Sequence, residues 1–218
     1  LVLNNGRPLA INWADENIPS IVEAWQLGTQ SGNAIAEVLY GDYNPSGKLP
    51  MTFPRNVGQV PLYYNHKNTG RPNLPEAETV FWSHYNDVEN TPLYPFGYGL
   101  SYTTFEYGTI KTTKSFDLDQ KITVSVAVTN TGKRKGKEVV QLYIRDKYAS
   151  ITRPVKELKG FELLELLPGE KKIVDFELTE KELGFYDNKG NWILEKGDFE
   201  IFIGGNSQTN NKITVEVK

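Results

Sequence analysis

The sequence lacks cysteine altogether and contains one methionine and two histidines among its 218 residues. Without cysteine the chain can form no disulfide and no thiolate metal site. His66 and His84 are too few for a histidine metal cluster. We therefore expect no metal and no other cofactor.

Long hydrophobic runs and clusters of basic residues are missing as well. No run of about eighteen apolar residues occurs, so we expect no membrane span, and no signal-peptide pattern opens the chain. The formal net charge is -3, with Lys and Arg scattered among the acids, which argues against a nucleic-acid partner. What is present, 39% apolar and 23% charged residues, indicates a folded globular protein.

The residues before position 100 have the strand, loop and helix order of an α/β layer. The apolar run LVLNN predicts a short strand that stops at Gly6, and IPSIVEAW is a second apolar stretch. The segment SGNAIAEVLYG predicts a helix that is capped by Ser31 or Asn33 and ends at Gly41. Prolines then forbid long helices as far as residue 95, at Pro45, Pro50, Pro54, Pro61, Pro72, Pro75 and Pro92.

Beyond residue 100 the hydrophobic period changes to two, which is typical of β-strands. KITVSVAVTNTG and EVVQLYIRD are expected to form two neighbouring antiparallel strands. In the second strand the apolar Val140, Leu142 and Ile144 lie opposite a face that carries Val139, Gln141, Tyr143 and Arg145. About seven such short strands, separated by Gly- and Asn-rich turns, predict an immunoglobulin-like sandwich.

Carboxylates on these strands alternate with apolar residues, as outward-facing residues do. We expect them on solvated faces, namely Glu138, Glu162, Asp175, Glu177 and Glu200. No Ser, His and Asp arrangement can be read from the sequence, and GKEVVQLY lacks the full spacing of a phosphate-binding loop.

Two loop segments combine aromatic rings with polar groups, YYNHKNTGRP at 63–72 and FWSHYNDV at 81–88. Rings that stack on a sugar face, together with amide and charged groups for its hydroxyls, are typical of a carbohydrate site on loops. The candidate substrate-binding residues are His66, Lys67, Arg71, Tyr85 and Asp87. The alternative interpretation is that these loops only bridge two domains.

Several longer motifs in a fixed order resemble the C-terminal portion of glycoside hydrolase family 3 enzymes of the β-glucosidase type. They are NGRPLAI, EAWQLGTQSGNAIAEVLYGDYNPSGKLPMTFPR, YYNHKNTGRP, PLYPFGYGLSYTTF, VTNTGKRKGKEVVQLYIRD and RPVKELKGFELLELLPGE. The resemblance covers essentially the whole chain. It implies a (β/α)8-type barrel, then an α/β sandwich domain, then a fibronectin type III-like domain, of which this chain matches the end of the second and all of the third.

The predicted fold is therefore a partial α/β layer, incomplete without upstream polypeptide, followed by an all-β fibronectin type III-like sandwich. We expect the α/β part at 1–92, an aromatic and Gly-rich interdomain joint at 93–102, and the sandwich at 103–218. Gly97 and Gly99 would permit the turns of the joint, whose rings either seal the domains together or stack on sugar.

The resemblance also implies a function. The family is a set of retaining glycosidases, in which an Asp nucleophile and a Glu acid/base flank the scissile bond about 5 Å apart. Neither residue has a counterpart here, so we expect this chain alone to be inactive. It would give scaffold and aglycone-side contacts to an enzyme that releases terminal non-reducing β-D-glucosyl residues from a β-glucoside or oligosaccharide, secreted or in the periplasm.

Two questions stay open at this point. The chain begins with Leu1 inside a predicted strand, and two strands with one helix cannot close an α/β layer. We expect either a cut precursor whose pieces stay associated or an isolated fragment. The alternative function is a non-catalytic carbohydrate-binding or structural module.

Overall fold

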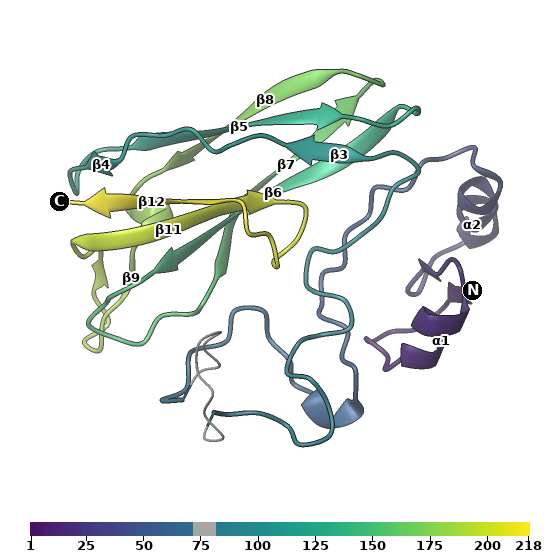
Figure 1. The fold of residues 1–218 in the computed structure, drawn as a ribbon, viewed down its shortest axis with the longest axis horizontal. Coiled ribbons are helices and arrows are strands. Elements are labelled where there is room, and N and C mark those ends of the chain that lie inside the picture. The colour runs from purple at the N-terminus through teal and green to yellow at the C-terminus, as the bar shows by residue number, and fades with distance from the viewer. Residues whose placement is uncertain (72–81) are drawn as a thin grey trace.

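The computed structural model describes residues 1–71 and 82–218 (Figure 1). Two short helices and a pair of short strands gather at the N-terminal end of the molecule, and a large β-sandwich forms the rest. Largely irregular segments at 41–71 and 82–104 run between these two parts. The prediction that no long helix lies between residues 41 and 95 is confirmed for the described part of that segment, 41–71 and 82–95, where only the 3-10 helix η1 (Val57–Gln59) occurs. Pro72 and Pro75 lie outside them.

The N-terminal part is a fragment of an α/β layer. Its parallel strands β1 (Val2–Leu3) and β2 (Val22–Glu23) are two residues long each. The helix α2 (Ser31–Tyr40) lies in the predicted segment and ends at Gly41 as predicted, where the C-cap has a φ of +82°. The predicted side-chain cap is wrong, because the N-cap is Gln30 and no side chain caps it.

A second helix, α1 (Asn12–Asn17), was not predicted from the sequence. It has six residues, only Ala14 is buried, and no side chain caps its N-terminus. Tertiary contacts hold it instead, since the Tyr94 hydroxyl donates to Asp15 at 2.5 Å and the Asn12 amide donates to the Arg55 carbonyl at 2.9 Å. A helix this short depends on such contacts rather than on its own sequence.

The sandwich packs a five-stranded sheet, β4-β12-β11-β6-β7, against a three-stranded sheet, β3-β5-β8. The strands of the larger sheet are β4 (Ser115–Phe116), β6 (Gly136–Asp146), β7 (Glu157–Leu166), β11 (Gly197–Gly204) and β12 (Lys212–Val217). Those of the smaller sheet are β3 (Phe105–Tyr107), β5 (Ile122–Asn130) and β8 (Lys171–Leu178). A helix α3 (Glu180–Leu183) and the hairpin of β9 (Phe185–Tyr186) and β10 (Trp192–Ile193) complete it.

The predicted pairing of β5 with β6 is wrong, because the two strands lie in opposite sheets. Both present apolar residues to the same core, including Val126 of β5 and Leu142 of β6. The Asn130 side chain fixes the crossover by donating to the carbonyls of Arg134 at 2.8 Å and Leu166 at 3.0 Å. Alternation separated the core-facing residues of β5 and the apolar residues of β6 from their polar neighbours, but it does not reveal which sheet holds a strand.

Two carboxylates that were predicted on solvated faces, Glu138 and Glu200, are buried. Gln141 and Tyr143 of β6 are buried as well, at 3% and 0% exposed. Glu162, Asp175 and Glu177 are exposed as predicted. The buried residues of β6 and β11 are covered because residues 93–99 and the loop 205–211 lie over the outer side of the larger sheet. The Gln141 amide donates to the carbonyls of Gly97 at 3.1 Å and Gly205 at 2.7 Å.

Candidate functional site

The structure brings the two predicted loops together. The Ser83 amide donates to the Arg71 carbonyl at 3.0 Å, and the hydroxyls of Thr69 and Ser83 lie 3.2 Å apart. Asn90 donates to the Ser83 carbonyl at 2.7 Å and closes the second loop. Pro72 and Phe81, at the ends of the two segments, lie outside the described residues.

His66 and Lys67 are held against the sandwich. The Val155 amide donates to the His66 carbonyl at 2.9 Å, and Lys67 forms a β-bridge with Pro154. These contacts use the backbone, so both side chains remain exposed. The sandwich therefore positions this loop through backbone contacts, and the side chains of His66 and Lys67 remain accessible to a ligand.

Arg71, Tyr85 and Asp87 are also exposed. The Tyr85 backbone amide donates to the side-chain oxygen of Asn90 at 3.1 Å, and the Tyr85 residue is 42% exposed. Beside it, the rings of Trp82 and His84 stack at 4.3 Å. Two loops that hydrogen-bond to each other therefore expose five polar or aromatic candidates, and the second loop also carries one stacked ring pair.

Tyr64, in the first segment, has the bridging role of the alternative interpretation. Its ring stacks on Phe96 at 4.2 Å and meets Tyr143 edge-on at 5.9 Å. Its hydroxyl accepts a hydrogen bond from the Leu158 amide at 3.3 Å. Burial raises the pKa of Tyr64. One loop thus combines a half-buried anchor, Tyr64, with exposed candidates for binding.

The other rings in and just after the joint divide between the two parts. Tyr94 stacks on Tyr98 at 5.3 Å and lies against Phe53, within the N-terminal part. Phe105 packs on the core of the sandwich. The Phe96 carbonyl accepts a hydrogen bond from the Ser207 amide at 3.0 Å. Phe96 therefore contacts the N-terminal part through its ring, which stacks on Tyr64, and the sandwich through its backbone.

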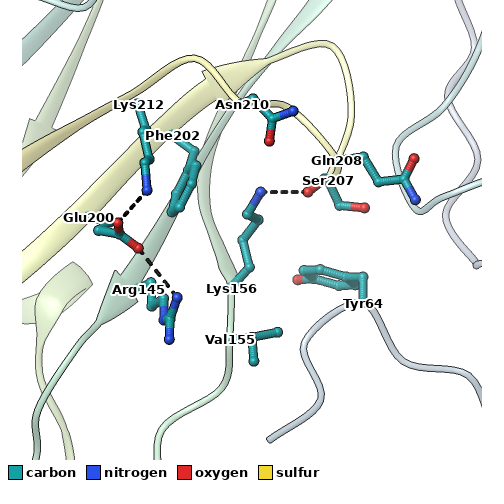
Figure 2. Close-up of a pocket in the computed structure, with 10 residues that line it drawn as sticks. All are labelled: Tyr64, Arg145, Val155, Lys156, Glu200, Phe202, Ser207, Gln208, Asn210 and Lys212. Atoms are coloured by element: carbon teal, nitrogen blue, oxygen red, sulfur yellow. Dashed lines mark hydrogen bonds and ion pairs between the residues drawn. The ribbon is translucent and has the colours of Figure 1, made fainter. Parts of the chain in front are cut away.

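A hollow of about 540 Å³ opens on the outer side of the larger sheet, between Tyr64 and the loop 205–211 (Figure 2). Three cations and one carboxylate line it, namely Arg145, Lys156, Lys212 and Glu200. Its other lining residues are Tyr64, Val155, Phe202, Ser207, Gln208 and Asn210. Sequence reasoning missed this site. The signal available was the ring of Phe202, which marks the polar face of β11 as partly covered.

Lys156 stands at the centre of the hollow. Its ammonium donates to the carbonyls of Ser207 at 2.8 Å and Thr209 at 3.1 Å, and it lies 4.0 Å from the centre of the Phe202 ring. Burial lowers the pKa of Lys156 to about 8, although the Glu200 carboxylate opposes that shift. The ammonium therefore fixes the loop 205–211 on the sheet.

Comparisons with known proteins agree with this architecture. Residues 1–102 match the glycosyl hydrolase family 3 C-terminal domain, and residues 138–207 match the fibronectin type III-like domain. The chain belongs to glycosyl hydrolase family 3. The predicted family is confirmed, and so is the predicted fold class, a partial α/β layer followed by a sandwich.

Curated relatives are enzymes several times longer. A periplasmic beta-glucosidase of Salmonella typhimurium is 53% identical over 208 residues, which are 95% of this chain and 27% of the relative. A beta-xylosidase of Formosa agariphila is 48% identical over 218 residues, which are 100% of this chain and 29% of the relative. The crystal structure of a beta-glucosidase from Listeria innocua in complex with glucose superposes with a TM-score of 0.96, at 45% identity, over 99% of this chain and 30% of that one. This family 3 chain thus spans less than a third of these relatives.

Two features of the described residues concern metals and membranes. Within 1–71 and 82–218, no group of three His, Asp or Glu side chains is arranged to hold a metal ion. No helix in the same ranges is long and apolar enough to cross a membrane.

Proposed function

We propose that this chain is the C-terminal part of a retaining β-glucosidase that releases terminal non-reducing β-D-glucosyl residues. The observation that carries the proposal is the 53% identity to a periplasmic beta-glucosidase across 95% of this chain but only 27% of that enzyme. The nucleophile Asp and the acid/base Glu then lie in the upstream portion. The same relative supports a periplasmic or secreted location.

The exposed apolar residues of the N-terminal part support an upstream partner. In α2 no residue is buried, Leu39 is 57% exposed and Tyr40 is 86% exposed. Trp13 of α1 is 69% exposed, and Val57 of η1 is 73% exposed. Large apolar side chains that are exposed in this number are typical of a part that another polypeptide covers. The upstream barrel and the first part of the α/β domain are the proposed cover.

For this chain we propose two contributions, a scaffold and contacts to the aglycone. The scaffold is the 103–218 sandwich, joined through 93–102 to the 1–92 part. The aglycone contacts are His66, Lys67, Arg71, Tyr85 and Asp87. Their exposure on two loops that hydrogen-bond to one another, one of them bridged to the sandwich, supports this assignment.

A second candidate substrate is a β-xyloside. The beta-xylosidase of Formosa agariphila shares 48% identity with the whole chain, close to the value for the beta-glucosidase. Relatives named for two different sugars thus share this chain about equally, so we infer that the upstream portion chooses the glycosyl unit. The non-catalytic alternative, a carbohydrate-binding or structural module, requires no upstream partner.

The test is an assay of the complete protein, this chain together with its upstream portion. We expect turnover of an aryl β-glucoside that exceeds turnover of the matching aryl β-xyloside. Faster hydrolysis of the xyloside would replace the proposed substrate by the second candidate. The absence of turnover on both would favour the non-catalytic module.

A further inference from the structure

The hollow around Lys156 carries more positive charge than its single carboxylate neutralises. Glu200 lies between two of the three cations, with Lys212 at 2.6 Å and Arg145 at 3.5 Å (Figure 2). Lys156 is occupied by backbone carbonyls rather than by a carboxylate. The lining therefore holds a net charge of about +2 before any ligand binds.

Arg145 keeps donors available for a ligand. Its contact with Glu200 is long for a charge-assisted hydrogen bond, and it is the one ion pair of Arg145 among the described residues. A guanidinium has five N–H donors in a planar fork that fits a carboxylate. The side chain is 39% exposed and that of Lys212 is 50% exposed, so both reach solvent at the mouth of the hollow.

The opposite wall provides groups that suit sugar hydroxyls. Gln208 and Asn210, whose side chains carry amides, line the hollow from the loop 205–211, and Tyr64 lies on the side of the N-terminal part (Figure 2). Lys156 fixes this loop, and Phe96 fixes Tyr64 by stacking, so the walls are preorganised. The volume of about 540 Å³ lies in the range that small-molecule ligands occupy.

We propose that this hollow binds a carboxylate-bearing sugar unit, with the carboxylate on Arg145 and Lys212 and the hydroxyls on the Gln208 and Asn210 amides. Binding involves no covalent step. The proposal goes beyond the hydrolysis proposed above and does not require it, because none of these four residues belongs to the loop candidates.

The test is calorimetric titration of the complete protein with methyl β-D-glucuronide, in the presence of glucose in excess to fill the site of hydrolysis. We expect saturable binding, and no binding of methyl β-D-glucoside, which lacks the carboxylate. Arg145→Gln should weaken the affinity about 10- to 100-fold, the effect of losing a hydrogen bond between charged groups. Raising the salt concentration should weaken binding further, because the hollow is open to solvent.

Two variants guard against effects on folding. Asn210→Ala leaves the ion pairs of Glu200 intact and should still weaken binding of the glucuronide. Lys121→Gln removes a cation from an exposed ion pair with Glu177 outside the hollow and should leave binding unchanged. The proposal would be overturned if the glucuronide did not bind, or if it bound Arg145→Gln with the wild-type affinity. Equally tight binding of acetate alone would also overturn it.

Discussion

Lys48 of the N-terminal part and Glu138 of β6 form an ion pair at 3.0 Å, with side chains only 13% and 7% exposed. The same ammonium donates to the Gly99 carbonyl at 2.9 Å, and the other Glu138 oxygen accepts from the Tyr107 hydroxyl at 2.8 Å. A buried carboxylate is stable only when its charge is paired and its oxygens are hydrogen-bonded. This cluster therefore ties the N-terminal part to the sandwich.

Replacing Lys48 by Met should destabilise the complete protein by about 3 to 5 kcal/mol, because Glu138 keeps a buried charge without its cation. Lys121→Met, which breaks an exposed pair, should change stability by less than about 1 kcal/mol. Calorimetric melting of both variants measures the difference. Adding Glu138→Gln to Lys48→Met should recover part of the loss, and a double variant as unstable as the single one would contradict this account.

The hydroxyl of Tyr107 should make the fold sensitive to alkali. Burial, and then the neighbouring Glu138 carboxylate, raise the pKa of Tyr107 above its ordinary value of 10.0. A raised folded-state pKa gives stability that is full below pH 10 and is lost as pH rises above it. Tyr107→Phe should melt lower than the wild type at pH 8, and the gap should narrow above pH 10. Tyr148→Phe, at a ring 74% exposed, is the control and should leave the wild-type profile unchanged.

Gly97 is required in the joint for two reasons. Its φ is +79°, and a Cβ built there would lie 2.1 Å from the Gln141 side-chain oxygen. Gly169, with a φ of +75°, has nothing within 4 Å of its Cβ position. Gly169→Ala should therefore cost only the left-handed backbone strain, about 1 to 2 kcal/mol. Gly97→Ala should cost more, as measured by melting temperature, and equal losses would mean that Gln141 moves aside freely.

The loop candidates should affect kinetics rather than stability. Replacing Arg71, Tyr85 or Asp87 by Ala in the complete enzyme should reduce kcat/KM on a disaccharide by about 1 to 3 kcal/mol of transition-state binding, while the melting temperature hardly moves. Phe96→Ala should instead lower stability by about 3 to 5 kcal/mol and leave the kinetics of the folded protein nearly unchanged. The reverse pattern would mean that the loop residues stabilise the fold and that Phe96 contacts the substrate.

The sequence predicted what depends on local period and turn chemistry. The alternation in β5 identified its buried face, and Gly41 marked the end of α2. Pattern could not assign β5 and β6 to opposite sheets, because both bury apolar residues in one core. Glu138 was predicted on a solvated face because the local pattern does not show which distant segments cover it. Its covering partners, Lys48 and Tyr107, come from other parts of the chain.

The candidate site was predictable only in part. Composition selected the two loops, and the structure shows them hydrogen-bonded to each other at Arg71 and Ser83. Composition did not separate Tyr64, a half-buried anchor, from the exposed His66 two positions later. The hollow around Lys156 was missed because its cations lie on three separate segments of the sandwich, at positions 145, 156 and 212.

The most direct test of the central claim is reconstitution. The purified 218-residue chain, its upstream portion, and the two expressed together would each be assayed on an aryl β-glucoside. We expect background turnover from this chain alone and clear turnover from the co-expressed pair, which should also purify as one complex. Turnover by a verified preparation of this chain alone, above the background of a matched blank, would contradict the assignment of both catalytic carboxyls to the upstream portion.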